Sequence, residues 1–253
     1  MFYKKYKTGL VLSGGSARGF AHLGAIKALE ESGISPDIIS GTSAGAIVGA
    51  FYADGYRPEE ILEILTHKKI FEYFRVTLPR TGLFRAAGLI EILKKNLRSK
   101  TFDKLSIPLI VTVTNLSKGI PEYIHSGELL NVLVASSSIP VIFEARKIND
   151  DLYADGGVMD NLPVGPLLNK CRKLVGVHAN PIVKMSKLRG LMHLAERSFH
   201  LAIATEVERK KSLFDFYIEP QKLGNYGLFD IRKGPEIFLI GYEAARKVIL
   251  KNR

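Results

Sequence analysis

Apolar and polar residues alternate along the chain with two different periods, and these periods predict its strands and helices. Short runs of β-branched and other apolar residues predict buried strands, whereas apolar residues spaced three or four apart predict amphipathic helices. Strands are expected over residues 8–13, 37–40, 109–114, 121–125, 173–178 and 214–219. Helices are expected over residues 21–31, 46–53, 57–69, 89–97, 128–136, 185–211 and 235–251, and residues 148–153 are polar and typical of a turn.

The order of these elements indicates the fold class. The first predicted strand, a glycine-rich loop, a helix and the second strand follow one another within about 35 residues, as in a βαβ unit. Such units build a parallel sheet that helices cover on both faces. We therefore expect an α/β fold, a three-layer α/β/α sandwich with a mainly parallel central sheet. Residues 1–253 are expected to form a single domain, with residues 181–253 as its extension.

Composition indicates whether the chain can form a core and where in the cell it is expected to be. Of the 253 residues, 46% are hydrophobic, which is enough for a sizeable core. No run reaches the ~18–20 apolar residues that span a bilayer. The basic stretch 1–7 is followed by too short an apolar run for a signal peptide. Because Cys171 is the single cysteine, an internal disulfide framework is excluded, and a cytoplasmic location is expected.

The positive net charge indicates which kinds of partner could attract the chain. The formal net charge is +11, with clusters at residues 4–7, 94–104 and 209–211. A basic protein is attracted to nucleic acid or to an anionic membrane surface. No zinc-ligand spacing, RNA-binding aromatic motif or helix-turn-helix pattern accompanies the charge. We expect no nucleic-acid partner. Two explanations of the basic residues remain: peripheral contact with an anionic membrane, or charges that simply face solvent.

The pentapeptide at residues 41–45 has the pattern G-x-S-x-G and lies between a predicted strand and a predicted helix. In this context the pattern is typical of a nucleophile elbow, a sharp turn that exposes its serine. Gly41 and Gly45 leave room for the strand and the helix to approach, and the start of the helix points N–H groups at Ser43. Ser43 is therefore the candidate nucleophile. The alternative is an ordinary Gly-Ser loop before a helix.

A glycine-rich loop follows the first predicted strand. It does not fit a P-loop, which needs Lys where Phe20 stands, nor the pattern G-x-G-x-x-G, because residue 16 is serine. The backbone N–H groups of such a loop can converge on an anion, as an oxyanion hole requires. The candidate oxyanion residues are Gly14, Gly15, Ser16, Ala17, Arg18 and Gly19. The side chain of Arg18 could add positive charge there or anchor the loop to a backbone carbonyl.

Ser43 needs a base to accept its proton. In the α/β-hydrolase order an acidic residue and then a histidine follow the serine, and His178, His193 or His200 could be that histidine. His178 ends an apolar strand, and the other two lie on a predicted helix. Each of the three therefore fits a structural role better than a catalytic one.

Asp155 is the other candidate base. Gly156 and Gly157 follow it after a strand-like segment, so its carboxylate can stand at a tight turn with the backbone cleared around it. An aspartate is ordinarily a poorer base than imidazole, but burial beside Ser43 would raise its proton affinity. The alternative is an ordinary Asp-Gly turn.

Residues 70–88 form a long irregular segment in which apolar residues alternate with Arg75, Arg80 and Arg85. Segments of this length are often lids or binding loops. This composition would suit an apolar, anionic substrate or a lipid surface. A loop that packs its aromatic residues into the core is the alternative.

Five stretches, taken together, resemble sequence blocks of the patatin-like phospholipase family. They are the oxyanion loop at residues 14–19, the elbow at 41–45, a block at 135–140, the D-G-G motif at 155–157 and Asn161-Leu162-Pro163. The resemblance covers about residues 8–180 in the order and spacing of the family. Residues 181–253 carry no motif that can be transferred.

The resemblance implies a function as well as a fold. It implies the three-layer sandwich shared with the catalytic domain of cytosolic phospholipase A2. It also implies a Ser–Asp dyad without a catalytic histidine, in which Ser43 is the nucleophile and Asp155 the base. The expected reaction is hydrolysis of phospholipids or other acyl esters through an acyl-enzyme, with no metal and no cofactor. The other hypothesis is a basic regulatory protein that retains the fold and binds anionic lipid or a partner.

Overall fold

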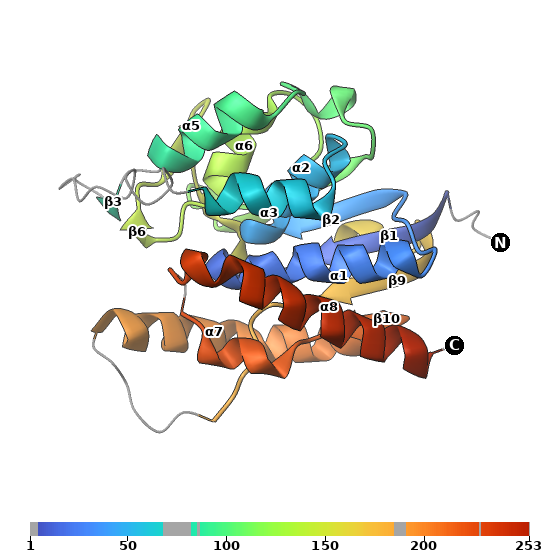
Figure 1. Cartoon of the computed structure of the whole chain (residues 1–253). Coiled ribbons are helices and arrows are strands. Elements are labelled where there is room, and N and C mark those ends of the chain that lie inside the picture. The colour runs from blue at the N-terminus through green and yellow to red at the C-terminus, as the bar shows by residue number, and fades with distance from the viewer. Residues whose placement is uncertain (1–4, 68–81, 85–86, 185–190, 228, 253) are drawn as a thin grey trace.

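The computed structural model describes residues 5–67, 82–84, 87–184, 191–227 and 229–252 (Figure 1). The predicted lid, residues 70–88, lies mostly outside this set. Only the short strand β3 (Gly82–Phe84) and the first residues of helix α5 (Ala87–Asn96) belong to it.

The described strands form an eight-stranded sheet and a small separate one. The bounds are β1 Tyr6–Leu12, β2 Ile38–Thr42, β4 Leu109–Asn115, β5 Ile120–Ile124, β6 Val141–Phe143, β7 Arg146–Ile148, β8 Asp151–Asp155, β9 Cys171–Val177 and β10 Phe216–Ile218. The large sheet has the order β10-β9-β1-β2-β4-β8-β7, with β5 also paired to β4, and β3 pairs with β6. The five strands from β10 to β4 are parallel, whereas β5, β8 and β7 add antiparallel pairs.

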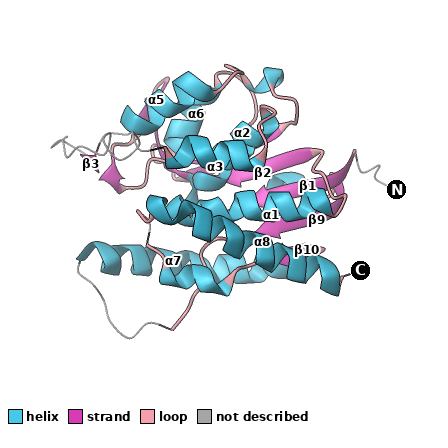
Figure 2. Cartoon of the chain, viewed as in Figure 1, coloured by secondary structure: helices cyan, strands magenta, loops and turns pink. Residues whose placement is uncertain are grey.

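Helices cover both faces of the large sheet (Figure 2). The helices are α1 Phe20–Glu31, α2 Ala44–Ala53, α3 Pro58–Thr66, α5, α6 Leu129–Ser136, α7 Leu191–Lys210 and α8 Gly234–Lys251. All of them except α7 contribute side chains to one core, on the face to which Leu10 and Leu12 point. Val207 of α7 packs against Val11 on the other face. The predicted three-layer α/β/α sandwich with a mainly parallel sheet is therefore confirmed.

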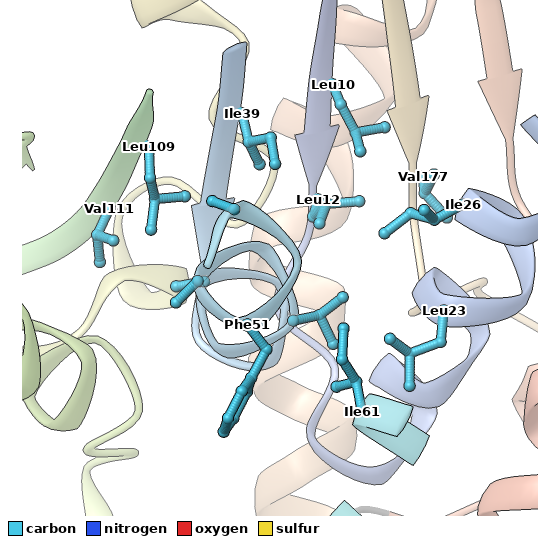
Figure 3. Close-up of a cluster of buried hydrophobic side chains, with 14 of the residues drawn as sticks. Leu10, Leu12, Leu23, Ile26, Ile39, Phe51, Ile61, Leu109, Val111 and Val177 are labelled. Atoms are coloured by element: carbon cyan, nitrogen blue, oxygen red, sulfur yellow. The ribbon is translucent and has the colours of Figure 1, made fainter. Parts of the chain in front are cut away.

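Successive side chains of a strand point to opposite faces, and this explains why neighbouring apolar residues of the central strands are buried in different layers. Figure 3 shows Leu10, Leu12 and Ile39 directed into the same layer as Phe51 of α2 and Ile61 of α3. All five side chains are buried. The apolar runs of these strands identify them in the sequence, although β2 and β4 also contain buried hydroxyl residues such as Thr42 and Thr112.

The C-terminal part of the chain is built into this architecture. β10 extends the sheet beside β9, and α8 packs along α1. The two helices approach so closely that a Cβ at Gly24 would lie 1.9 Å from the carbonyl oxygen of Phe238. A Cβ at Gly241 would lie 2.1 Å from the carbonyl oxygen of Ala21. Neither glycine can gain a side chain without separating the helices.

Two predicted elements differ from the structure, and the start of a third lies outside the described residues. Residues 148–153, predicted as a turn, include the end of β7 and the start of β8, which pair antiparallel. β7 is the edge strand of the sheet, and β8 lies between it and β4. The polar side chains of β7 and of the start of β8 reach solvent, so the apolar signal is missing. The helix predicted over 57–69 ends at Thr66 in the described part, and the one predicted over 185–211 is described only from Leu191.

Candidate active site

Ser43 stands at the turn between β2 and α2 in a strained backbone conformation. Its φ is 53° and its ψ is −119°, a region that residues other than glycine rarely adopt. The strand ends one residue before Ser43, and the helix begins one residue after it. A Cβ at Gly41 would lie 2.7 Å from the carbonyl oxygen of Gly45, and one at Gly45 would lie 2.4 Å from that of Leu12. The turn therefore requires both glycines.

The strained residue is held by a side chain from another helix. The N–H of Ser43 donates to Oγ of Ser136 over 2.8 Å, and Oγ of Ser136 donates to the carbonyl oxygen of Thr112 over 2.7 Å. Ser136 is the last residue of α6 and is fully buried. A single hydroxyl thus links the elbow to β4, which pairs with β8.

Asp155 ends β8 in a tight turn. Its N–H donates to the carbonyl oxygen of Ser138 over 2.9 Å, and its carboxylate accepts the N–H of Gly157 over 2.7 Å. A Cβ at Gly156 would lie 2.3 Å from the carbonyl oxygen of Thr112, so the turn lies directly on β4. The two glycines allow the carboxylate to enter the interior, and Asp155 is only 4% exposed.

The structure brings Ser43 and Asp155 together, although they lie far apart in the sequence. Burial raises the pKa of Asp155 to about 6, and hydrogen bonds from the Ser43 hydroxyl and the Gly157 N–H act to lower it. The effect of burial on the pKa is larger than that of the hydrogen bonds, because water is excluded from the carboxylate. The result is a carboxylate that lines the same cavity as Ser43 and has a higher proton affinity than an aspartate in water.

The glycine-rich loop packs against the elbow. Residues Ser16–Gly19 form a short 3₁₀ helix before α1, and a Cβ at Gly19 would lie 2.6 Å from Cβ of Ala44. A Cβ at Gly14 would lie 3.4 Å from Cβ of Ser43. The N–H of Gly14 donates to the carbonyl oxygen of Asn161 over 3.2 Å. The loop therefore lies beside the nucleophile.

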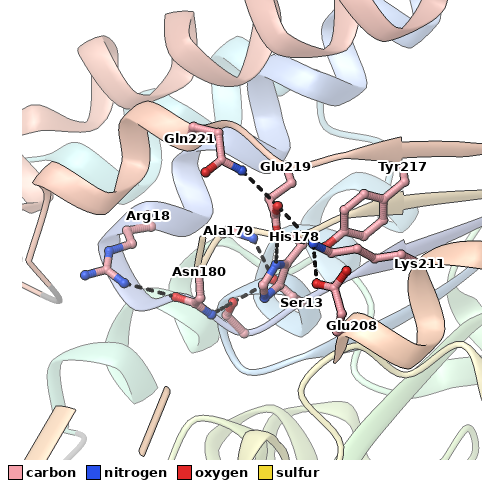
Figure 4. Close-up of polar contacts among 11 residues, drawn as sticks. Ser13, Arg18, His178, Ala179, Asn180, Glu208, Lys211, Tyr217, Glu219 and Gln221 are labelled. Carbon is pink, nitrogen blue, oxygen red and sulfur yellow. Dashed lines mark hydrogen bonds and ion pairs between the residues drawn. The ribbon is translucent and has the colours of Figure 1, made fainter. Parts of the chain in front are cut away.

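The side chain of Arg18 anchors this loop. Nε donates to the carbonyl oxygen of Tyr226 over 2.7 Å, and Nη1 donates to Oδ1 of Asn180 over 3.4 Å. Figure 4 shows Arg18 reaching Asn180 beside the polar cluster around Glu219. Of the two roles considered for Arg18, the contacts fit that of an anchor to a backbone carbonyl.

The three candidate histidines have different surroundings. Nδ1 of His178 lies 2.8 Å from Oε1 of Glu219, and its ring stacks on Tyr217 (Figure 4). His200 lines a cavity together with Ser43, and burial, followed by the charge of Arg18, lowers its pKa to about 3. His193 lies in α7, and its side chain is outside the described part.

Two cavities meet at Ser43. The first is almost entirely apolar and runs among α1, α2, α3 and α5, with Phe20, Ile47, Leu65, Leu89, Ile92 and Phe143 in its wall. The second contains the polar groups of the site, and Gly14, Gly15, Asp155, Asn161, Asn180 and His200 line it. Ser16 and Ile139 line both cavities. The second cavity is also largely apolar, since Pro140, Ile142 and Phe199 line it as well. An ester bound at Ser43 therefore has apolar space on both sides, with the polar groups gathered near the carboxylate.

Sequence reasoning gave no role to three polar residues that support the site: Ser136, Asn161 and Asn180. The first two lie within stretches that the family resemblance covers. The amide Nδ2 of Asn161 is buried and has no hydrogen-bond partner among the described residues. Asn180 follows the end of β9, at the edge where the carboxyl ends of parallel strands meet and ligands usually bind. That position is the signal that could have identified it.

The described residues offer neither a metal site nor a membrane-spanning helix. No three His, Cys, Asp or Glu side chains among them are arranged to hold a metal ion. No helix in this part of the chain has the length and apolar character needed to cross a membrane.

The family model of the patatin-like phospholipases matches residues 10–168, well over half of the chain. The chain belongs to the patatin-like phospholipase family. The matched segment includes the glycine-rich loop, the elbow and Asp155, so the resemblance noted from the sequence is confirmed.

Curated relatives of the chain are much longer proteins. Lysophospholipase NTE1 of Kluyveromyces lactis is 30% identical over 270 residues, which cover 92% of this chain but 18% of that protein. An uncharacterised NTE family protein of Mycobacterium tuberculosis is 30% identical over 182 residues, 71% of this chain and 49% of that protein. The chain thus spans at most about half the length of these relatives.

A solved structure shares the fold. The crystal structure of VipD from Legionella pneumophila superposes with a TM-score of 0.57 at 17% identity. The superposition covers 98% of this chain and 67% of VipD. At this identity the likeness supports the fold alone.

Proposed function

We propose that the chain is a serine acyl hydrolase, which cleaves carboxylic esters of phospholipids or other acyl lipids through an acyl-enzyme. The observation that carries the proposal is the buried Asp155 carboxylate in the same cavity as Ser43, which stands at a strained elbow. Membership of the patatin-like phospholipase family and the lysophospholipase relative support the same class of reaction.

In the first half-reaction Oγ of Ser43 attacks the ester carbonyl carbon while Asp155 accepts the hydroxyl proton. A pKa near 6 makes this carboxylate a stronger base than an ordinary aspartate, yet leaves it ionised at neutral pH. The bond to the alcohol then breaks, and the alcohol leaves with the proton that Asp155 held. The acyl group remains on Ser43.

In the second half-reaction water attacks the acyl-enzyme and Asp155 accepts its proton. The bond between the acyl carbon and Oγ of Ser43 then breaks, Oγ takes back the proton that Asp155 held, and the carboxylic acid leaves. Both steps create a negative oxygen, which N–H groups of the loop 14–19 and of the start of α2 are positioned to stabilise. Because the N–H of Gly14 is engaged by Asn161, we assign the main loop donor to Gly15.

The apolar cavity fits the acyl chain of the substrate. Its wall is formed by side chains of four helices and reaches Ser43 directly. A long hydrocarbon chain gains roughly 0.8 kcal/mol for each methylene that it buries, so such a wall would favour lipids over short esters. The second cavity, which contains Asp155, would receive the alcohol side of the ester.

We also propose peripheral contact with anionic membranes. The net charge of +11 is the observation behind it, because a basic protein is drawn to an anionic lipid surface. Co-sedimentation with vesicles of anionic and of neutral lipid checks this. Binding that anionic lipid does not increase, or that salt does not weaken, would contradict the electrostatic contact.

The catalytic proposal is tested with a short p-nitrophenyl ester and a fluorophosphonate probe. We expect the probe to label Ser43, and Ser43→Ala and Asp155→Asn each to lower kcat by at least about 10³-fold, because the two groups act as a unit. Ser32→Ala, at the opposite end of α1 from the glycine-rich loop, is the matched control. Full activity in Ser43→Ala would refute the proposal.

A histidine triad is the competing mechanism. If replacement of His178, His193 or His200 by Ala abolished turnover in a folded protein as completely as Ser43→Ala, the assignment of Asp155 as the direct base would be wrong. A panel of phospholipid, lysophospholipid, neutral lipid and thioester then identifies the substrate.

A further inference from the structure

The peptide group between Gly14 and Gly15 is held by two side chains. The carbonyl oxygen of Gly14 accepts a hydrogen bond from Nδ2 of Asn180 over 2.7 Å. It accepts a second one from Oγ of Ser13, also over 2.7 Å. Both donors are buried, with Asn180 3% and Ser13 0% exposed. Both lone pairs of this carbonyl are therefore occupied.

The two donors are themselves fixed from further along the chain. Oδ1 of Asn180 accepts from Arg18, and Oγ of Ser13 accepts the N–H of Ala179 over 2.9 Å. Figure 4 shows Ser13, Ala179, Asn180 and Arg18 in one continuous group. Because the acceptor side of the Asn180 amide faces the guanidinium, its donor side faces Gly14, and the orientation of the amide is determined.

The orientation of the carbonyl determines that of the next N–H. A trans peptide is planar, so the N–H of Gly15 points away from the carbonyl oxygen of Gly14. Hydrogen bonds to that oxygen also polarise the peptide and strengthen its N–H as a donor. Gly15 lines the same cavity as Ser43 and Asp155.

We propose that Asn180 is a positioning residue for the oxyanion hole. It fixes and polarises the Gly14–Gly15 peptide so that the N–H of Gly15 is directed at the oxygen that becomes negative when Ser43 is acylated. The inference rests on the proposed acyl hydrolase function. It gives Asn180 a part in the reaction although its side chain does not touch the reacting atoms.

The test is Asn180→Asp, assayed with a p-nitrophenyl ester at pH 8. The substitution keeps the size of the side chain and an acceptor for Arg18, but it replaces the donor to Gly14 by a second acceptor. We expect kcat to fall about tenfold to a hundredfold, somewhat less than the loss of a direct oxyanion donor, with KM within about twofold. Asn225→Asp, an exposed residue with the same change of charge, is the matched control.

A second measurement separates positioning from general damage to the fold. Thionoesters place sulfur where the oxyanion would form, and sulfur is a weak hydrogen-bond acceptor, so an oxyanion hole favours the oxygen ester. We expect Asn180→Asp to lower the ratio of oxygen-ester to thionoester turnover by about as much as it lowers kcat. If that variant does not fold, Asn180→Ala, which removes the donor without adding an opposing charge, takes its place.

The outcomes are distinguishable from failure of the proposed function. A folded variant with unchanged kcat and an unchanged oxygen-to-sulfur ratio overturns the role of Asn180 while Ser43→Ala remains inactive. A lower kcat with an unchanged ratio also overturns it. An inactive wild type, or a fully active Ser43→Ala, overturns the acyl hydrolase proposal itself.

Discussion

Two glycine-rich turns meet at the active site, and they are held in different ways. The elbow at residues 41–45 is fixed mainly by contact between backbones, since a Cβ at Gly45 would overlap the carbonyl oxygen of Leu12. The loop at residues 14–19 is fixed mainly by side chains, among them Asn180 and Arg18. Both turns follow parallel neighbouring strands, β2 and β1.

The difference has a consequence for function. The shape of the elbow is specified within a few residues, so a change there should destroy it outright. The loop takes its orientation from residues more than 160 positions away, so changes there should weaken the site by degrees. Three predictions test this difference, in order of the size of the expected effect.

The largest effect is expected for Gly45→Ala. The new methyl group would lie 2.4 Å from a backbone oxygen that cannot move without disturbing β1, so we expect a loss of at least about 3 kcal/mol in the free energy of unfolding. Labelling of Ser43 by a fluorophosphonate should disappear. Urea unfolding measures the first effect.

Gly165→Ala is the matched control, because nothing lies within 4 Å of a Cβ at that position. Its stability should change by no more than about 0.5 kcal/mol. Equal losses in the two variants would show that the close contact at Gly45 is not what fixes the elbow.

A smaller effect is expected for Ser136→Ala, which removes a distant side chain that binds the backbone of the elbow. The N–H of Ser43 and the carbonyl oxygen of Thr112 each lose a partner, at about 1–3 kcal/mol for each buried group. We expect kcat to fall about tenfold with little change in KM. Ser138→Ala is the control, since that buried hydroxyl binds Val134 inside α6. A normal kcat in Ser136→Ala would mean that the conformation of the elbow does not depend on the hydrogen bond from Ser43 to Ser136.

The smallest effect concerns pH. Because Asp155 must be ionised to act as the base, kcat/KM should rise with pH, reach half its maximum at about pH 6 and then level off. Asn180→Ala, which adds no charge to the cavity that both residues line, should leave this midpoint in place, since burial, Ser43 and Gly157 set the pKa of Asp155. A midpoint near 4 would contradict the buried carboxylate.

The same pKa has a consequence for stability, whose sign is opposite to that of most aspartates. The folded protein binds the Asp155 proton more tightly than the unfolded chain, so this group lowers stability as pH rises from about 4 to 6. Asp155→Asn should therefore gain stability relative to the wild type over that range, as measured by thermal unfolding.

The sequence predicted what is specified locally. A few consecutive residues are enough to predict the elbow, the D-G-G turn and each central strand. Ser136 and Asn180 could not be given roles, because polar residues after a helix or a strand have no periodic pattern and their partners lie 93 and 166 positions away. The role of Arg18 stayed open for the same reason, since Tyr226 is 208 positions away. The pair β7–β8 was missed because its edge position tolerates polar residues.

The close crossing of α1 and α8 at Gly24 and Gly241 matters for anyone who shortens this chain. A fragment trimmed to the matched family segment, residues 10–168, would keep every motif of the active site. It would nevertheless lose α8 and also β9, the strand that pairs with β1. Such a fragment would expose the bare glycine face of one helix and an unpaired strand edge, and we expect it to aggregate when expressed.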